Sequence, residues 1–562
     1  MLCWKPTRAT LSLRLKFKHS FILLSLCLRV ESRVTRHWFF HNFTVEQVVI
    51  ANVLSAPTDP QRYNQLLSSN YAPLDSEVTF IHSFVSATAA RLAAWDEEVI
   101  PLQVSHDLVD EEHAMLLSLH RRYASILSPL RRFPSELLLE IFSWTLPSAK
   151  DLQDPLQICM LNCPWNLTHV CQRWRTLTIN TPWLWSLVVI NYMSEELDAS
   201  IAFPLPMLET QIARAQKLKI HFYGDEYSDP EPQIEAFECL AKHSTCWEEL
   251  TIGLTSQIFP LIVSLENDIP SLRKLSIRWE DPDIPAEADP IQIFQTAPSL
   301  TEVNVYNGLH PISVLLPMRQ LTHYQLDAPW EIHWNILKEV PNLQEARIII
   351  PYPDEVDIWP NAGLPIHLSD LRQIFISHSR VLDYIRIPNI QDVTVDLKQE
   401  EIPVLQQWIA SIANLCQIRR FVIIGEPTAN LVHCILSKLP TVVELALFGQ
   451  EPGNELNDII SRLTFTTNLT MPVLAPQITG IWLGSIHKDS INHALYIGMI
   501  ESRLMAENCT LKHVGLADPG LDLDLTKMQD QLSDFGLDFS LTTGKSGCLA
   551  MSDHWSSIVL WN

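Results

Sequence analysis

The sequence predicts an α/β repeat protein in which parallel strands follow a small all-α unit. A pattern of apolar-x-x-apolar-x-apolar residues recurs between residues 215 and 516, which is typical of short strands in a repeat array. Amphipathic helical patterns dominate residues 104–179 instead. Because 562 residues exceed what one hydrophobic core supports, several domains or a repeat array are expected.

The repeats account for most of the chain. The anchors of the successive copies are Ala215/Leu218/Ile220, Trp247/Leu250/Ile252, Leu272/Leu275/Ile277, Leu300/Val303/Val305, Leu321/Tyr324/Leu326, Leu343/Ala346/Ile348, Leu371/Ile374/Ile376, Ile390/Val393/Val395, Ile418/Phe421/Ile423, Val442/Leu445/Leu447, Ile478/Ile481/Leu483 and Leu511/Val514/Leu516. A proline stands two residues before the first anchor at Pro270, Pro298, Pro341, Pro388, Pro440 and Pro476. Helix-like pieces such as "EIHWNILKEV" (331–340) and "EIPVLQQWIASIANLC" (401–416) separate most copies.

A short strand plus a helix repeated about every 20 to 30 residues is the signature of leucine-rich repeats, whose stacked units share one core. The pattern therefore predicts a solenoid over residues 191–545, with parallel strands on the concave side and helices outside. Its irregular unit lengths and missing asparagine ladder make it a degenerate leucine-rich-repeat solenoid. Generic α/β structure remains the alternative.

Upstream lies the small all-α unit. In "FPSELLLEIF" (133–142), Pro134 suits a first helical turn and Glu136 suits the positive end of the helix dipole. The apolar residues that follow give this helix one apolar face. "LTHVCQRWRTLTI" (167–179) predicts a second helix, and "TPWLWSLVVI" (181–190) closes the unit.

The order FP-S-ELLLEIF, a gap, VCQRWRTL and LWSL resembles the F-box, a three-helix module that docks on the Skp adaptor of Skp/cullin/F-box ubiquitin ligases. The resemblance implies adaptor contacts by Phe133, Pro134, Leu137, Leu138, Ile141, Phe142, Val170, Trp174, Leu177 and Trp185. Two departures are a phenylalanine at 133, where the family has leucine, and a longer stretch between Pro147 and Pro164. The whole order is similar to a large group of fungal F-box proteins.

The remaining boundaries follow from the pattern. Residues 1–88 are expected as a largely disordered extension, in which residues 51–88 form linker with one short helix. An amphipathic helix is expected over 89–127, the F-box over 128–190, and a C-terminal tail or cap over 546–562. The apolar run "FILLSLCL" (21–28), which follows Lys16 and Lys18, is similar to the apolar core of a signal peptide. No small-x-small cleavage pattern follows it.

Composition narrows the function. A net charge of −24 argues against duplex nucleic acid or an anionic membrane as the main partner. The short run at residues 21–28 cannot span a bilayer, which needs about 20 apolar residues. Eleven dispersed cysteines favour reduced thiols, hence cytoplasm or nucleus.

Catalytic and metal signals are weak. "TGKSG" (543–547) echoes a phosphate loop but has Phe539 where that motif needs its first glycine. Cys159, Cys163, His169 and Cys171 have unusual spacing for zinc, and Cys171 belongs to a helix pattern. No cofactor, no metal and no catalysis are expected. Most tryptophans, Trp279, Trp330, Trp334 and Trp482 among them, are expected in the core rather than on a binding surface.

The resemblance to F-box proteins therefore implies a non-catalytic substrate-recognition subunit of a Skp/cullin/F-box ligase, whose repeats would bind an unknown protein substrate for ubiquitination. Two alternatives stay open. One is an F-box interaction protein that does not direct degradation, and the other is a secreted leucine-rich-repeat binding protein.

Overall fold

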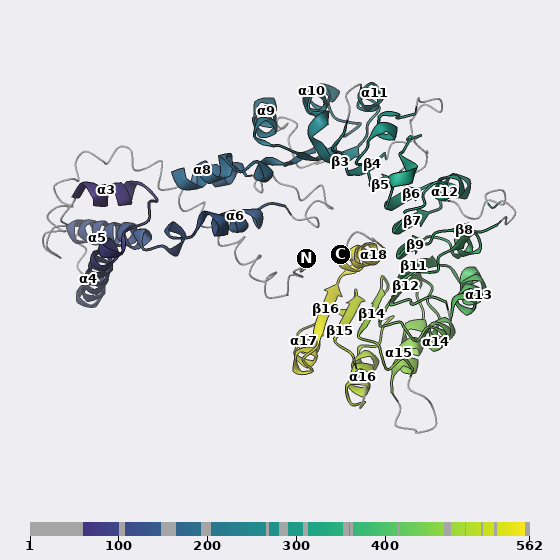
Figure 1. Cartoon of the computed structure of the whole chain (residues 1–562). Coiled ribbons are helices and arrows are strands. Elements are labelled where there is room, and N and C mark those ends of the chain that lie inside the picture. Colours follow the sequence, from purple (N-terminus) through teal and green to yellow (C-terminus); the bar gives the residue numbers. More distant parts are fainter. Residues whose placement is uncertain are drawn as a thin grey trace. The chain divides into compact units, whose positions relative to one another are not determined.

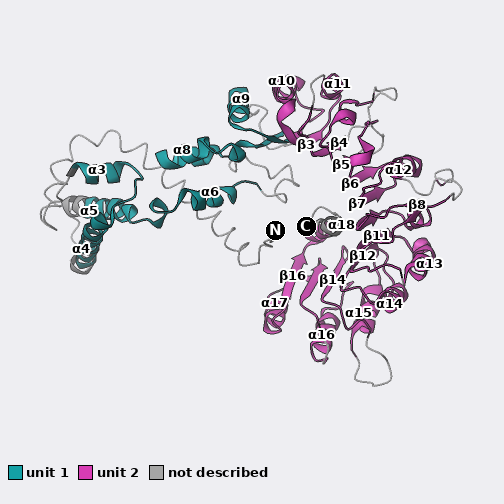
Figure 2. Cartoon of the chain, in the orientation of Figure 1, with its two compact units in different colours: residues 1–221 teal, residues 222–562 magenta. Residues whose placement is uncertain are grey.

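The computed structural model describes most of the chain after residue 59. The described residues are 60–99, 107–147, 164–192, 204–265, 269–279, 290–306, 313–351, 359, 364–413, 415–465, 474–488, 490–506, 510–521 and 525–556. The chain divides into two compact units, residues 1–221 and residues 222–562 (Figure 2).

Three helices open the described part of unit 1. They are α3 (Pro60–Ser68), α4 (Asp75–Val99) and α5 (Asp107–Ile126). They enclose an apolar cluster of Tyr63, Leu66, Ile81, Phe84, Leu119, Tyr123 and Ile126. The 3₁₀ turn η1 (Pro129–Arg131) follows, and the Arg131 guanidinium donates to the Leu66 carbonyl oxygen at 2.8 Å. This bond ties the three helices to the next segment.

The expectation for residues 51–88 is wrong wherever the structure describes them. The sequence predicts linker with one short helix, whereas α3 and most of α4 occupy residues 60–88. The helix expected over 89–127 is in fact the end of α4 followed by α5. Alanines and small polar residues in "SATAARLAAW" favour helix by propensity, but they dilute the periodicity on which the prediction depended. Residues 1–59 lie outside the described residues.

The next part of unit 1 is a compact helical group. It comprises α6 (Ser135–Ser143), α7 (Trp165–Val170), α8 (Gln172–Ile179) and the 3₁₀ turn η5 (Pro182–Trp185). Its core consists of Leu138, Phe142, Leu167, Trp174, Leu184 and Trp185. The single helix predicted over 167–179 is two helices, because Cys171 is extended at φ −160° and ψ 170°. Its sulfur accepts a hydrogen bond from the Trp174 amide and caps α8.

A parallel sheet of 14 strands dominates the rest of the structure (Figure 1). Its strands are β1 (Leu187–Asn191), β2 (Leu218–Tyr223), β3 (Trp247–Gly253), β4 (Lys274–Arg278), β5 (Glu302–Tyr306), β6 (His323–Asp327), β7 (Glu345–Ile349), β9 (Gln373–Ile376), β11 (Asp392–Leu397), β12 (Arg420–Gly425), β13 (Glu444–Gly449), β14 (Gly480–Ser485), β15 (His513–Asp518) and β16 (Asp538–Thr543). Strand order follows chain order. A separate parallel pair joins β8 (Ile366–His367) to β10 (Ile385–Arg386).

The repeat motif gives the sheet its core. Every predicted copy contains one strand, and every anchor except Ala215 is buried. The prediction of repeated parallel strands is therefore confirmed. The motif missed β1 and β16, the first and last strands of the sheet. None of the β16 side chains is fully buried, and the motif fails at this strand because Gly536 occupies the position of the first apolar anchor.

Helices cover one face of the sheet in unit 2 (Figure 1). The connecting helices are α10 (Pro230–Ala241), α11 (Phe259–Val263), α12 (Trp330–Leu337), α13 (Ile402–Ile412), α14 (Ala429–Lys438), α15 (Glu455–Leu463), α16 (His493–Leu504) and α17 (Leu525–Asp534), and α9 (Leu205–Arg214) connects β1 to β2. Short 3₁₀ turns also lie in the connections between strands: η7 (Ser244–Cys246), η8 (Ile293–Thr296), η9 (Met318–Gln320), η11 (Ser379–Asp383) and η12 (Gln399–Glu401). The helices predicted at 331–340 and 401–416 are α12 and α13.

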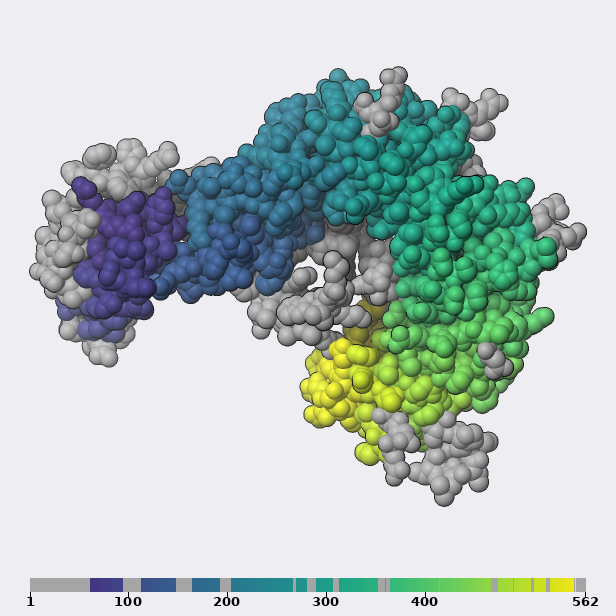
Figure 3. Space-filling view, viewed as in Figure 1, coloured from purple at the N-terminus to yellow at the C-terminus, as the bar shows by residue number. Residues whose placement is uncertain are grey.

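The opposite face of the sheet is called the inner face here. Its side chains alternate with the buried anchors along each strand. The colours of unit 2 run in chain order from teal to yellow over its surface, so consecutive repeats are neighbours (Figure 3). The last described helix, α18 (Lys545–Ser556), differs from the others because it lies on the inner face (Figure 1). Residues 546–556 of the segment expected as a tail or cap therefore belong to a helix against the sheet, and residues 557–562 lie outside the described residues.

Candidate functional site

The first candidate surface is the outward face of α6. Pro134 caps this helix, and its carbonyl oxygen accepts the first helical bond from the Leu138 amide at 3.1 Å. Leu137 is 52% exposed, Pro134 is exposed and Ile141 is half-buried. Positions 134, 137 and 141 are separated by one and two helical turns, so they share one face. An apolar side chain this exposed at the centre of such a face is suited to contact a partner.

Other predicted site residues on α6, α8 and η5 lie in the core of the helical group. Leu138, Phe142, Trp174 and Trp185 are buried in the core of the helical group, so they support the surface rather than line it. The rings of Phe142 and Trp174 have centroids 4.7 Å apart. The Trp185 indole also donates to the Thr178 carbonyl oxygen at 2.7 Å. These contacts fix the relative positions of α6 and α8.

Besides Ile141, three more predicted residues are half-buried. Phe133, Val170 and Leu177 all pack against the same core and keep part of their surface accessible. Arg173, which the sequence did not single out, donates from its guanidinium to the carbonyl oxygens of Arg131 and Phe133. It thereby holds the turn before α6 against α8. Its position in "VCQRWRTL" gave no periodic signal, because a polar residue that serves backbone carbonyls has no apolar pattern.

The second candidate surface is the inner face of the sheet. Its central row places these residues side by side in register: Thr251, Ser276, Asn304, Gln325, Arg347, Phe375, Thr394, Val422, Ala446, Trp482, Gly515 and Ser540. The row is polar from β3 to β7 and mainly apolar from β9 to β14. The inner face therefore has two chemically different halves.

Charged residues form a second row, at the amino ends of the strands. Lys274 Nζ lies 3.7 Å from Glu302 Oε2. On the next pair of strands, His323 Nε2 lies 3.4 Å from Glu345 Oε1. The hydrogen bond with Glu345 raises the pKa of His323, although burial opposes the effect. Farther along, Arg420 is 2.6 Å from Glu444. The row can recognise polar groups of both signs, and pairs that are partly exposed stabilise the fold only weakly.

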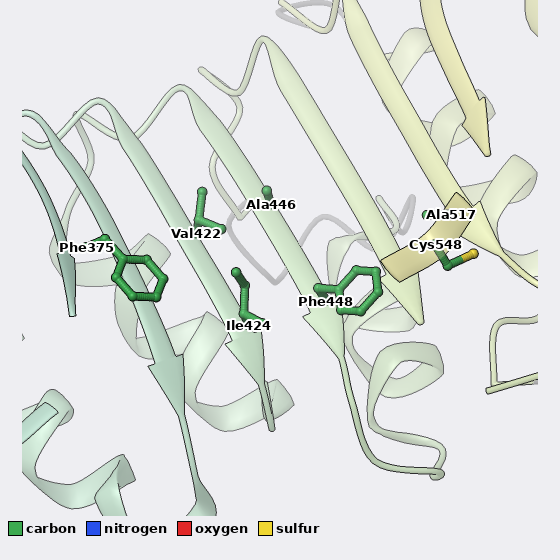
Figure 4. Packing of buried hydrophobic residues seen from close by; sticks show 7 residues of the cluster. All are labelled: Phe375, Val422, Ile424, Ala446, Phe448, Ala517 and Cys548. Atoms are coloured by element: carbon green, nitrogen blue, oxygen red, sulfur yellow. The ribbon is translucent and has the colours of Figure 1, made fainter. Parts of the chain in front are cut away.

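The apolar half contains a continuous cluster. Its sheet residues, called the inner apolar patch here, are Phe375, Val422, Ile424, Ala446, Phe448 and Ala517. Cys548 of α18 belongs to the same cluster (Figure 4). Trp482 and Met551 pack against this cluster. Apolar side chains on the inner face would ordinarily meet water, and the packing of Cys548 and Met551 against the cluster shields part of that apolar surface.

An acidic residue borders the patch. Asp396 on β11 is in register with Ile424 on β12. Burial and the nearby negative charge of Glu401 raise the pKa of Asp396 to about 6, and Lys398 opposes the shift. Burial also raises the pKa of Asp392, which lies four residues earlier on the same strand and the same face. The edge of the patch therefore favours a cationic neighbour.

Among the residues that the structure describes, no three His, Cys, Asp or Glu side chains come together as metal ligands. Cys159 and Cys163 lie outside those residues. Within the same described ranges, none of the helices combines the length and hydropathy that a membrane span requires.

The comparisons with known proteins gave no match. The chain matches no protein-family model, and no curated protein is similar enough to it to be matched.

Proposed function

We propose that this protein is the substrate-recognition subunit of a Skp/cullin/F-box ubiquitin ligase. In this proposal the group α6–α8 is an F-box that docks on the Skp adaptor, and the sheet is a degenerate leucine-rich-repeat solenoid that binds a protein substrate. The observation that carries the proposal is the outward apolar face of α6. Leu137 stands 52% exposed at its centre, between Pro134 and Ile141.

The core beneath that face supports its role in docking. An adaptor surface needs apolar side chains held in fixed positions, because ordering them only on binding would reduce the affinity. The contacts of Phe142 with Trp174 and of Arg173 with the turn before α6 provide that rigidity. A hot spot at Leu137 would then be surrounded by half-buried neighbours that exclude water.

The inner face supports substrate binding. Its two halves offer charged pairs along one stretch and apolar side chains along another, which is the combination that protein interfaces use. The protein itself performs no chemistry in this proposal. It holds the lysines of a bound substrate near the ubiquitin-charged enzyme, so a high effective concentration replaces a slow encounter.

Co-expression with a Skp adaptor and a cullin tests the proposal. We expect the full chain to co-purify with both in one complex, and the cullin to be lost when the adaptor is omitted. A folded chain that elutes alone in the presence of excess adaptor would contradict the proposal. An inhibitor of cullin activation should also stabilise any substrate that the complex captures, which separates a degradative role from simple assembly.

A further inference from the structure

The C-terminal helix occupies the inner apolar patch. α18 lies against β12, β14, β15 and β16, across the direction of the strands. Figure 4 shows Cys548 beside Ala517, facing the same side of the sheet as Phe448 and Ile424. The inner apolar patch therefore already holds a short helix.

The contact of α18 is one-sided. Cys548 is fully buried and Met551, three residues later, packs against the same cluster. Leu549 points elsewhere and is 43% exposed. Residues three apart share one helix face, so the binding feature is an apolar pair at i and i+3. A helix of 12 residues is marginal by itself in water, hence α18 depends on the sheet for its order.

The link to α18 permits movement as a unit. Gly544 separates β16 from α18 and has a φ of +72°, a conformation that other residues adopt only with strain. A Cβ at this position would meet nothing within 4 Å, so space around the link is open. Gly544 is therefore the residue at which the chain turns from β16 into α18.

The floor of the site is shaped for a large apolar object. Trp482 lies across Gly480 on its own strand and Gly515 on the neighbouring strand, where added Cβ atoms would overlap its ring at 2.3 Å and 2.1 Å. The ring therefore rests on bare backbone and presents its other side to the space above the sheet. Asp396 at the edge adds a place for a cation next to Ile424.

We propose that the inner apolar patch is a binding site for an amphipathic helix of a partner protein, and that α18 occupies this site as an intramolecular competitor until the partner displaces it. The partner helix carries a small and a long apolar side chain at i and i+3, with a lysine or arginine toward Asp396. That this partner is a ligase substrate rests on the proposed function. The existence of the site does not.

A tethered competitor sets the apparent affinity. Because α18 is linked to the sheet, its effective concentration at the patch is high, and a partner in solution binds only the fraction of molecules in which α18 has left. Weakening α18 therefore strengthens binding of a partner helix without any change in the patch. This consequence distinguishes a competitor from a permanent cover.

The experiment uses the full chain and a fluorescent peptide with the α18 sequence, KSGCLAMSDHWS, under reducing conditions. Met551→Asp in the chain should release α18 and lower the Kd of the peptide at least tenfold relative to the wild type. Leu549→Asp, which places the same charge on the exposed side of the same helix, should leave the Kd unchanged. Equal Kd values for all three chains, or equal binding of a scrambled peptide, would overturn the proposal.

Hydrogen exchange of the wild-type chain gives an independent readout that needs no variant. The α18 amides should exchange through a local opening, much faster than the amides of β13. Exchange of both at the same rate would show that α18 opens only with the sheet, and the proposal would fail. Neither measurement includes the adaptor, so failure here is distinguishable from failure of adaptor docking.

Discussion

The indole ring of Trp482 lies directly over Gly515, its partner in register on the next strand. A Cβ at position 515 would come within 2.1 Å of the ring atom Cδ1, a separation that real Cβ atoms do not reach. Gly480 leaves the same space under the far end of the ring. The two glycines thus fix where the largest side chain of the inner face lies.

Gly515→Ala should displace the Trp482 ring and destabilise the protein by about 1–3 kcal/mol, the usual cost of forcing extra volume into a packed site. Urea unfolding followed by tryptophan fluorescence measures both effects. Gly498→Ala is the matched control, because Gly498 lies in α16 and a Cβ there meets nothing within 4 Å. The control should stabilise the helix by about 0.5–1 kcal/mol. Equal effects of the two substitutions would contradict the assigned ring position.

Asp396 should make stability depend on pH. The pKa of Asp396 is about 6 in the folded protein and about 3.9 in the unfolded chain. Between about pH 4 and pH 6 the carboxyl group is therefore protonated mainly in the folded state. The stability that this proton provides is complete below pH 4 and is lost as the pH rises through 6. Asp396→Asn should therefore be more stable than the wild type by about 2 kcal/mol at pH 7.5, with the difference closing at pH 4. An identical difference at both pH values would contradict the raised pKa.

Arg503 should stabilise the loop after α15. The buried guanidinium donates to the carbonyl oxygens of Leu463 at 2.9 Å, Leu474 at 3.0 Å and Ala475 at 3.3 Å, and it lies 4.5 Å from the Phe465 ring centroid. Arg503→Met keeps the length of the side chain but removes its donors, which should cost about 3 kcal/mol. Arg503→Lys retains one charge with fewer well-directed donors and should recover part of the loss. A methionine variant as stable as the wild type in urea would show that these bonds contribute nothing.

The repeat strands could be predicted from the sequence because each contributes buried anchors with period two. Ile481 and Leu483 on β14 are examples, and both are fully buried. β16 did not match the motif, because Gly536 stands where the first apolar anchor is needed, although Phe539 and Leu541 occupy the other two anchor positions. The helix α4 was not predicted because it owes its helical structure to the high propensity of alanine and has no clear apolar periodicity. The break at Cys171 depends on one extended residue, and a pattern of apolar side chains does not report backbone angles.

The candidate site was predictable in part. Apolar spacing identified the correct segment on α6, but it could not separate exposed Leu137 from buried Leu138, because adjacent residues both fit the pattern. The inner apolar patch could not be predicted from the sequence at all. Its members, such as Phe375 and Phe448, belong to strands about 70 residues apart, and only the stacking of repeats brings them together. The contact of α18 with this patch likewise could be found only from the structure.

Binding of the full chain to the Skp adaptor, measured by calorimetry with the wild type and two variants, tests the central claim most directly. Leu137→Asp places a charge at the centre of the proposed docking face and should weaken binding by about 30-fold or more. Trp183→Asp adds the same charge to the same helical group at a side chain that is 47% exposed, outside the predicted docking set, and should bind like the wild type. Equal affinity of both variants and the wild type, or no binding by a folded wild-type chain, would contradict the assignment of α6 as the adaptor surface.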